Sequence, residues 1–586
     1  MNLVFVKLAT KTNKSHSNYL KLFLAEAKTT GLAIGLGSLL MANTASVMAQ
    51  TPNAGVLQQN IERERQNKLP TKEPQPVLPA PVVNNTVKDT ATVSVQQFQF
   101  SGNTLISDVE LTALLQQYRQ KPLTINDLNM AAANVAQHYR QQGWLVRTGF
   151  PEQDITDGIV IIGVIEAQFG GISYHTSEGV GAGDEKLTAQ QTAQVTNIFE
   201  HQLANGEKLD LGALDRGLLI SNDLPGVVVS GSLVEGVAQN QTQLKLNLSK
   251  DRLFSGRIQL DNHGSRSTGP ERILGLFSLN NPTNRGDQLS ATLMHTQGSD
   301  YLWLEYSMPV GSNGWRIAAS ASKLNYEMIA SEFSGLDIEG SSSSMGVEAT
   351  YPLIRSRNKN VFLAIGYRQE DFDNDILSSD FSNYDIRRIT AELSGNRFDD
   401  YYGGGVTSAT AQWVMGDLDL SKTDIGENPD LDNQYYKLRV SVSRQQMLTD
   451  DITLMARISG QIADSPLDSY EKFYLGGPSG VRAYPVSEAG GTEGWAATVE
   501  VSKQLKNNLL LSTFVDAGHV YEKGSGPDYD LYGGGLRLNW AVNQAINVDA
   551  IWSHRIGNNP NKTATGKDQD GSLKTNRFWL SASWNF

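Results

Sequence analysis

Two stretches of the chain hold residues that could form a specific ion pair. Gly476 to Pro485 is rich in glycine and contains one arginine, Arg482. Its glycines, proline and serine favour turns, which predicts a loop. Downstream, Asp516 lies in an alternating run and points away from the apolar face. If the strands close into a barrel, this carboxylate faces the interior and could pair with the arginine. The alternative is that both are ordinary charges of a wet interior.

Length and composition limit the class of protein. A chain of 586 residues is expected to hold more than one domain. The net charge of −13 argues against a nucleic-acid partner. The absence of cysteine excludes disulfides, thiolate catalysis and cysteine metal sites. No run of 18 apolar residues follows the N-terminal segment, so no membrane helix is predicted, but half-apolar strands could cross a membrane.

Motifs of enzyme chemistry are missing from the sequence. There is no Gly-x-x-x-x-Gly-Lys-[Ser/Thr] run, no Gly-x-Ser-x-Gly elbow and no His-Glu-x-x-His pair, and the eight histidines are scattered. We therefore predict no cofactor, no metal and no enzymatic activity. A glycosidase-like pair of carboxylates stays open because acidic residues are abundant, although nothing favours one.

The N-terminal region is predicted to hold a signal peptide, a helix and a linker. Five lysines precede an apolar stretch that ends near Ala49, so residues 1–49 read as a signal peptide. An uncleaved membrane anchor is the weaker alternative, because the apolar core is short. Residues 50–69 favour a helix whose apolar stripe is too thin to bury well, which suits solvent or a polar cavity. A disordered leader is the other interpretation. Residues 70–91 form a stiff, proline-rich linker.

Two small α/β modules follow the linker. Residues 92–166 read as a strand, two helices and two strands, because helical spacing of apolar residues gives way to alternation. Residues 167–251 repeat the same order. The two modules are therefore an internal repeat of structure, although their sequences are not obviously alike.

From residue 252 the alternation of polar and apolar residues has a period of two. About sixteen such segments occupy residues 252–586, and bacterial barrels close with an even number of strands. We expect short turns at one end of the barrel and long loops at the other, around 371–384, 421–434, 464–493 and 558–575. Alternation continues to the last residue, with aromatic side chains at Phe578, Trp584 and Phe586. A soluble sheet with one wet face fits the alternation as well, but the terminal aromatic favours a transmembrane barrel.

This order of segments resembles the TpsB transporters of two-partner secretion, within the Omp85 superfamily. The two modules resemble POTRA domains, and Phe100-Ser101-Gly102-Asn103-Thr104 is similar to the first strand and turn of that domain. The loop motif of the family reads Val-Arg-Gly-Tyr, and this chain has an alanine in the third place. The matching positions are Gly476, Gly477, Val481, Arg482, Ala483 and Tyr484. A glycine-to-alanine change is mild where φ is negative and needs explaining where φ is positive.

The resemblance implies the fold and the roles of three groups of residues. The fold would be mainly β, a 16-stranded antiparallel transmembrane β-barrel preceded by two POTRA domains (92–166 and 167–251). Loop 464–492 would fold into the lumen, with its arginine against the strand motif Phe514, Asp516 and Gly518. Helix 50–69 would plug the lumen, with Val56, Leu57, Ile61, Arg63 and Arg65 along it. Phe578, Trp584 and Phe586 would form the C-terminal barrel-recognition signal.

The resemblance also implies a function. A secreted exoprotein of the TpsA type (an adhesin, a haemolysin or a contact-dependent inhibition toxin) would bind the periplasmic POTRA domains and thread through the outer-membrane barrel without ATP. Further partners would be outer-membrane lipid and lipopolysaccharide, and the barrel-assembly machinery during biogenesis. The main alternative is an assembly factor that inserts other barrels, which usually has more than two POTRA domains. A passive porin and a barrel-embedded protease or lipase are weaker alternatives.

Overall fold

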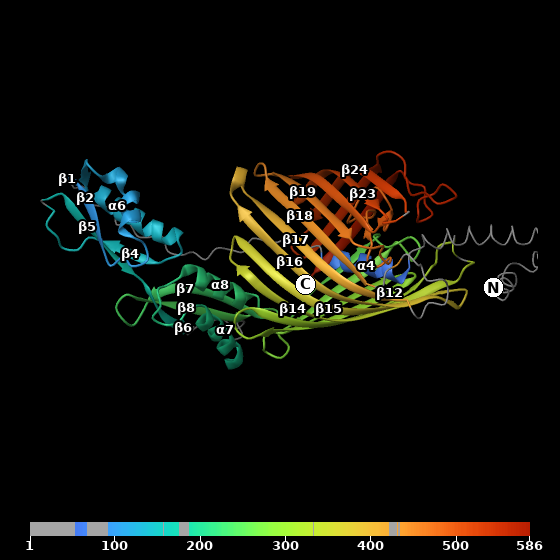
Figure 1. Ribbon diagram of the computed structural model, residues 1–586, viewed down its shortest axis with the longest axis horizontal. Helices are drawn as coiled ribbons and strands as arrows, with labels where there is room; N and C mark the ends of the chain where they lie inside the picture. Colours follow the sequence, from blue (N-terminus) through green and yellow to red (C-terminus); the bar gives the residue numbers. More distant parts are fainter. Residues whose placement is uncertain are drawn as a thin grey trace, which may run out of the picture.

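The computed structural model describes residues 53–66, 92–155, 157–174, 187–331, 333, 335–420, 431, 434–524 and 526–586. The predicted signal peptide (1–49) and proline-rich linker (70–91) lie outside the described residues. Figure 1 shows two small modules at one end of a large barrel and helix α4 (Ala54–Gln66) within the barrel. In the described part of the chain, no helix has the length and apolarity needed to cross a bilayer.

Sixteen antiparallel strands close into one barrel, which confirms the predicted fold class. Neighbours in sequence pair throughout, and five residue pairs, from Ser581–Asp261 to Asn585–Arg257, join the last strand to the first. The strands are β9 (Phe254–Asp261), β10 (Arg272–Asn280), β11 (Gln288–Thr296), β12 (Ser299–Val310), β13 (Trp315–Glu327), β14 (Ile338–Arg355), β15 (Lys359–Ile376), β16 (Ser379–Asp399), β17 (Gly405–Asp419), β18 (Gln434–Met447), β19 (Ile452–Ala463), β22 (Glu493–Gln504), β23 (Leu509–Tyr521), β24 (Asp528–Ala541), β25 (Ile546–Arg555) and β26 (Asn576–Asn585).

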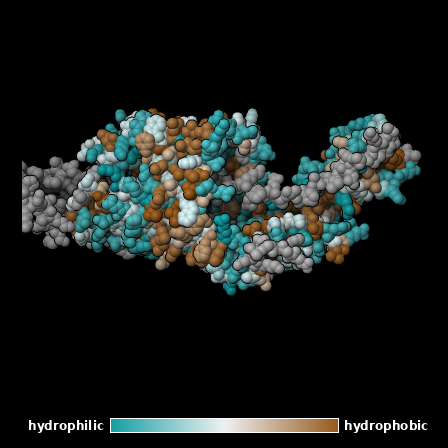
Figure 2. All heavy atoms as spheres, turned by 180° about the vertical axis from the view of Figure 1, so that it is seen from behind, coloured by the Kyte–Doolittle hydropathy of each residue, from teal (hydrophilic) through white to brown (hydrophobic). Residues whose placement is uncertain are grey.

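The alternation of the strands separates an apolar outer face from a polar lumen. Val440 and Val442 of β18 are exposed on the outer face, while Arg439 points inward and donates to backbone oxygens in the lumen. Figure 2 shows hydrophobic residues gathered across the wall of the barrel, with hydrophilic residues toward the end away from the modules. This pattern fits a wall that faces lipid on one side and water on the other.

One predicted loop is wrong. Residues 371–384 were expected to be a long loop, but β15 continues to Ile376 and β16 begins at Ser379. The connection is two residues, Leu377 and Ser378, with φ of 53° and 57°, as tight hairpins require. The acidic residues of this stretch hid its alternation, in which Phe372 points inward and stacks on Tyr384 at 4.9 Å between ring centroids. Polar residues on both sides of a strand are compatible with a hairpin that extends into water.

The two modules each place helices against a three-stranded sheet. In the first, β2 lies parallel to β5 and β4 lies antiparallel to it, while the short β1 and β3 form a separate pair that was not expected. In the second, the strand order is β6-β8-β7. The elements are β1 (Thr92–Ser94), β2 (Gln97–Ser101), α5 (Asp108–Leu114), η2 (Gln116–Tyr118), β3 (Pro122–Thr124), α6 (Ile125–Gln141), β4 (Val146–Gly149), β5 (Ile159–Glu166), β6 (Gln168–Tyr174), α7 (Ala189–Gln202), α8 (Leu211–Asn222), β7 (Val227–Glu235) and β8 (Gln241–Lys250).

A buried carboxylate joins the two modules. Glu166, at the end of β5, accepts hydrogen bonds from the backbone nitrogens of Thr104 (2.6 Å) and Leu105 (2.8 Å), and pairs with Lys208 of the second module at 2.9 Å. Burial alone would raise the pKa of Glu166, but the Thr104 hydroxyl, Lys208 and the two backbone groups outweigh it and lower the pKa to about 2. The charged form therefore stabilises both the first module and its junction with the second.

Replacing Glu166 with glutamine is expected to remove this stabilisation in a pH-dependent way. Hydrogen bonds to a charged group contribute about 1.5–3 kcal/mol each in general. Because the folded pKa is below the unfolded value, the contribution is full above about pH 4.3 and is lost as the pH falls toward 2. Pepsin should thus cleave residues 92–250 of the variant faster than those of the wild type at pH 5, with the difference vanishing near pH 2. Equal cleavage of the variant and the wild type at pH 5 would contradict the stabilising role of Glu166.

The second module is docked on the barrel through helix α8. Arg355, at the end of β14, donates to both carboxylate oxygens of Asp223, at 2.9 and 2.7 Å, and Arg216 of α8 donates to the carbonyl of Pro352 at 2.8 Å. Arg357 of the same turn pairs with Asp215. These two ion pairs, one to Asp215 within α8 and one to Asp223 just after it, hold the module at the end of the barrel where the short turns lie.

Candidate functional site

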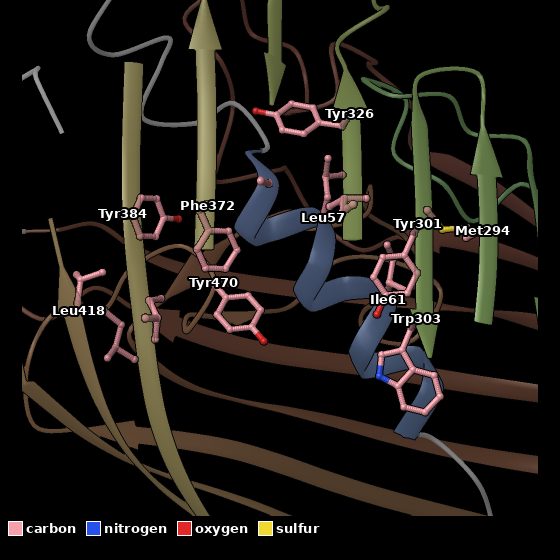
Figure 3. Close-up of a cluster of buried hydrophobic side chains, with 14 of the residues drawn as sticks. Leu57, Ile61, Met294, Tyr301, Trp303, Tyr326, Phe372, Tyr384, Leu418 and Tyr470 are labelled. Carbon is pink, nitrogen blue, oxygen red and sulfur yellow. The ribbon is translucent and has the colours of Figure 1, made fainter. Parts of the chain in front are cut away.

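The lumen holds helix α4, the described part of the predicted helix 50–69. Leu57 and Ile61 are 7% and 6% exposed, and they pack in a cluster with aromatic residues of the barrel wall (Figure 3). Val56 is buried as well. The cluster also contains Met294, Tyr301, Trp303, Tyr326, Phe372, Tyr384 and Tyr470. The apolar stripe of the helix is thin, as expected. Most of the remaining helix surface makes polar contacts with the loop and the barrel wall.

Those polar contacts join the helix to loop 464–492, which follows β19 and contains the short strands β20 (Phe473–Tyr474) and β21 (Gly490–Gly491). Gln59 donates to the carbonyls of Tyr470 (2.7 Å) and Lys472 (2.6 Å), and Arg63 donates to that of Tyr474 (2.9 Å). The helix thus supplies hydrogen-bond donors to three backbone oxygens of this loop.

Acidic side chains of the helix are paired with arginines of the wall. Glu62 lies 3.2 Å from Arg368 and 3.7 Å from Arg388, and accepts from the Tyr470 hydroxyl at 2.9 Å. Glu64 pairs with Arg272 of β10. The side chain of Arg65, also assigned to the plug, lies outside the described part of the chain. Charged contacts hold the helix firmly but can be exchanged for water, unlike a large apolar interface.

Arg482 and Asp516 lie together, with the arginine 5% and the aspartate 1% exposed. Nε and Nη2 of Arg482 each donate to one carboxylate oxygen of Asp516 at 2.9 Å, and its backbone nitrogen donates to the same carboxylate at 3.1 Å. Nη1 donates to Glu500 at 2.8 Å, and the guanidinium lies 3.3 Å from the ring centre of Phe514. A bidentate pair inside the wall is a geometry that favours arginine over lysine.

The glycines of the loop allow its tight path. A Cβ on Gly480 would lie 1.9 Å from the carbonyl oxygen of Leu475, and one on Gly476 would lie 2.2 Å from that of Pro485. Gly477 has φ of 113°. On the wall, a Cβ on Gly518 would lie 2.6 Å from the side chain of Leu475. Gly476 and Gly480 therefore have no room for a side chain, the positive φ of Gly477 disfavours one, and a side chain at Gly518 would displace Leu475.

Ala483 fits where the resembling family has glycine. Its φ is not positive, so alanine adopts the conformation without strain. It is fully buried against Gly533 of β24, where an added Cβ would lie 2.6 Å from the alanine Cβ. Val481 and Tyr484 are buried beside it, and the guanidinium of Arg555 lies 4.6 Å from the ring centre of Tyr484.

A second set of contacts, which the sequence did not reveal, holds the loop from the last two strands. The Ser553 hydroxyl (β25) and the Trp579 indole nitrogen (β26) both donate to the carbonyl of Arg482, at 2.7 and 2.8 Å. Glu488 accepts from Asn559 at 3.0 Å and from the Gln569 backbone at 3.1 Å, in the loop between β25 and β26. The one available signal was the position of Trp579, an aromatic residue in the inward register.

The predicted C-terminal aromatics lie mainly on the outer face. Phe578 and Trp584 are 68% and 50% exposed there. Phe586 exchanges backbone hydrogen bonds of 3.1 Å with Gly256 of β9, and its ring lies 6.2 Å from that of Phe277. The last residue thus takes part in closing the barrel.

Replacing Trp579 with phenylalanine together with Ser553 with alanine is expected to loosen the arginine loop. The Arg482 carbonyl would lose both donors, and an unsatisfied buried group costs about 1–3 kcal/mol. The temperature at which the folded band is lost in electrophoresis should fall. Trp552→Phe, on the lipid face of β25, is the matched control and should leave that temperature unchanged. An unchanged double variant would contradict the anchoring role.

Comparison with known proteins places the chain in a family. The family model described as haemolysin secretion/activation protein ShlB/FhaC/HecB matches residues 240–540, more than half of the chain. The chain belongs to this family. The model of the ShlB-type POTRA domain matches residues 93–167. These matches confirm the resemblance stated from the sequence.

Relatives and solved structures agree with this membership. The heme/hemopexin transporter protein HuxB of Haemophilus influenzae is 25% identical over 514 residues, 83% of this chain and 86% of its own length. The outer membrane transporter CdiB of Dickeya dadantii is 23% identical, over 79% of this chain and 82% of its own length. The structure of CdiB from Escherichia coli superposes with a TM-score of 0.66 at 18% identity, over 91% of this chain and 98% of that one.

Membership of the family establishes where the protein is located and which class of function it has. The protein is an outer-membrane secretion transporter of the two-partner type, with its POTRA modules in the periplasm, and its relatives are transporters rather than enzymes. BamA from Haemophilus ducreyi lacking POTRA domains 1–3 shares the fold, with a TM-score of 0.50 at 14% identity. That likeness is of fold alone and gives the assembly-factor alternative less support.

Proposed function

We propose that this structure is the closed state of a polypeptide-secretion pore whose plug is helix α4. The observation that carries the proposal is the position of α4 in the lumen, held by exchangeable polar contacts such as Glu62 with Arg388 and Gln59 with loop carbonyls. Removal of the helix would free a path through the barrel. A substrate that competes for these contacts would shift the population toward the open state.

The periplasmic modules would capture the substrate by adding a strand to a sheet. Strand β7 is an edge of the second module's sheet, and in the described residues it pairs with β8 alone. Such an edge offers backbone groups to an extended chain of any sequence. The ion pairs of α8 hold this module at the barrel, so a captured chain lies near the entrance of the pore. The N-terminal secretion domain of a TpsA-type exoprotein would be the captured chain.

The lumen beside the plug suits an extended, hydrated polypeptide. A space of about 290 Å³ lies between α4 and the wall, lined by arginines of three strands (Arg388, Arg439 and Arg457) and by Glu348 and Glu392. Mixed charges bind water and favour no single side-chain type. Since the sequence has no nucleotide motif, we assign the driving force to folding of the exoprotein outside the cell. The cargo would be a large adhesin, haemolysin or inhibition toxin. Because the relative HuxB is described as a heme/hemopexin transporter protein, an exoprotein related to heme or hemopexin is a further candidate.

Other partners would act at other stages. Phospholipid and lipopolysaccharide would surround the outer face, and the barrel-assembly machinery would insert the chain during biogenesis. Neither of these interactions involves the lumen. A cross-link from the lumen therefore reports on the transported protein rather than on these partners.

The test is photo-cross-linking from the lumen in living cells of the source organism. A benzoylphenylalanine at Gln412 or Ser459, which line the space beside the plug, should cross-link to one large exported protein that is also found in the medium or on the cell surface. The same group at Val499, which is exposed on the lipid face, should not. Cross-links from the lumen to other outer-membrane barrels would overturn the proposal in favour of an assembly factor.

A further inference from the structure

The inward-facing side chains of the barrel change in character along its length. In the half away from the modules, buried residues of β12, β13, β15 and β16 form a cluster that we call the apolar patch: Tyr301, Trp303, Leu324, Tyr326, Phe372 and Tyr384. Nearer the modules, the same strands turn polar side chains into the lumen, such as Glu305 on β12, Ser320 on β13 and Thr390 on β16. The patch is therefore an apolar zone on the wall of a wet lumen.

Helix α4 lies at the level of this patch. Figure 1 shows the helix in the half of the barrel away from the modules, and Figure 3 shows Ile61 beside Tyr301 and Trp303. Leu57 packs in the same cluster. With the helix in place, Tyr301, Trp303 and Phe372 are only 3%, 5% and 1% exposed. Because these side chains face the lumen, the helix is part of what keeps them from water.

Departure of the helix would uncover apolar surface inside the barrel. Exposure of such surface to water is unfavourable roughly in proportion to its area. The water-filled interior of a transmembrane barrel is usually polar, and the positions nearer the modules follow this rule. The apolar patch breaks it, so the open pore is disfavoured unless other apolar groups take the places of Leu57 and Ile61.

An extended polypeptide can present apolar groups at the spacing that the helix uses. Leu57 and Ile61 are four residues apart on one face of α4, which places them about 6 Å apart along the helix axis. Alternate residues of an extended chain lie on one face about 6.6 Å apart. Two aliphatic side chains at positions i and i+2 of an extended chain therefore match the spacing of the pair on the plug.

We propose that the apolar patch is a binding site for aliphatic side chains of the translocating polypeptide, and that Leu57 and Ile61 occupy this site in the closed state. The inference rests on the proposed function, in which an extended exoprotein passes through the lumen. The required pattern is that of any strand with one apolar face, so it does not depend on a particular cargo. The passing chain would then compensate for the contacts that the plug gives up.

Two double variants remove the contact between plug and wall from opposite sides. Leu57→Ser with Ile61→Ser changes only the helix, whereas Tyr301→Ser with Trp303→Ser changes only the patch. Both should make spontaneous openings in planar bilayers more frequent, because the same contact is lost. The helix variant is therefore the matched control for loosening of the plug, and only the patch variant should alter the binding of a polypeptide.

The probe is a synthetic peptide of glycine and serine that carries one pair of leucines at alternate positions, compared with the same peptide without leucine. Added on the side of the modules to the open helix variant, the leucine peptide should block the current about tenfold longer, which corresponds to about 1.4 kcal/mol. In the patch variant the two peptides should block the current for equal times. Trp303→Ser alone is the milder change if the double patch variant does not migrate as a folded barrel in electrophoresis, and it should reduce the difference.

The outcomes separate this inference from the function on which it rests. If both peptides enter the helix variant and block it for equal times, the patch is only a seat for the plug and the inference is overturned. A full leucine effect in the folded patch variants would overturn the assignment to these residues. If the pore conducts ions but neither peptide ever blocks it, the polypeptide pore itself fails together with the binding site.

Discussion

Replacing Arg482 with alanine is expected to destabilise the barrel more than any other single change in the lumen. The substitution would leave Asp516 and Glu500, which are 1% and 5% exposed, without the guanidinium between them. Removing one partner of a buried pair costs about 3–5 kcal/mol, against about 0–1 kcal/mol for a surface pair. The temperature at which the folded band is lost in electrophoresis should fall clearly. Spontaneous current steps should also appear in planar bilayers, because the loop is no longer held against the barrel wall.

A second lumen pair provides the control for this prediction. Arg537 lies 2.7 Å from Asp549 but its side chain is 37% exposed, so Arg537→Ala should have a small effect. Arg482→Lys keeps the charge without the bidentate fork and should fall between the two. Equal stability of the Arg482 and Arg537 alanine variants would show that the loop arginine is an ordinary lumen charge.

Deleting residues 53–66 is expected to turn a quiet barrel into a conducting one. The helix occupies a cylinder about 10–12 Å wide with its side chains, and its removal opens that width through the lumen. Single-channel recording in a planar bilayer should show low current for the full chain and a steady large conductance for the deletion. The loop carbonyls that Gln59 and Arg63 satisfied would then be hydrated.

A milder variant tests the same contacts without removing the helix. Glu62→Gln keeps the size of the side chain and removes the charge that faces Arg368 and Arg388, so brief openings should become more frequent. Large and equal conductance in the full chain and the deletion would refute the plug. Silence in both would show that loop 464–492 seals the lumen by itself.

The barrel was predictable because each of its strands can be recognised from a short stretch of neighbouring residues. Each strand shows a period of two, and the turn residues between strands mark where pairing stops, so strand number follows from counting. The error at residues 371–384 has the same origin: where a hairpin rises into water, both faces are polar and the period disappears. The module order was predictable for a similar reason, but the short pair β1–β3 was too brief to show a pattern.

The candidate site was predictable only where a motif marked it. Arg482 and Asp516 came from resemblance, since nothing in an alternating strand tells one inward aspartate from another. Glu500, Ser553 and Trp579 were missed because their contacts are to the backbone or to a side chain already assigned a partner. The place of helix α4 was equally hidden, because a thin apolar stripe fits solvent as well as a polar lumen.

The wall of the barrel is uneven in height. Strands β15 and β16 have 18 and 21 residues, whereas β9 and β26 have 8 and 10, and a bilayer needs only about 9–11. At about 3.3 Å per residue, the taller side stands on the order of 20–30 Å above the lipid. An emerging polypeptide therefore has the tall wall of β15 and β16 on one side. On the other side it passes a low wall, where the last strand meets the first, which is bordered by the loop between β25 and β26.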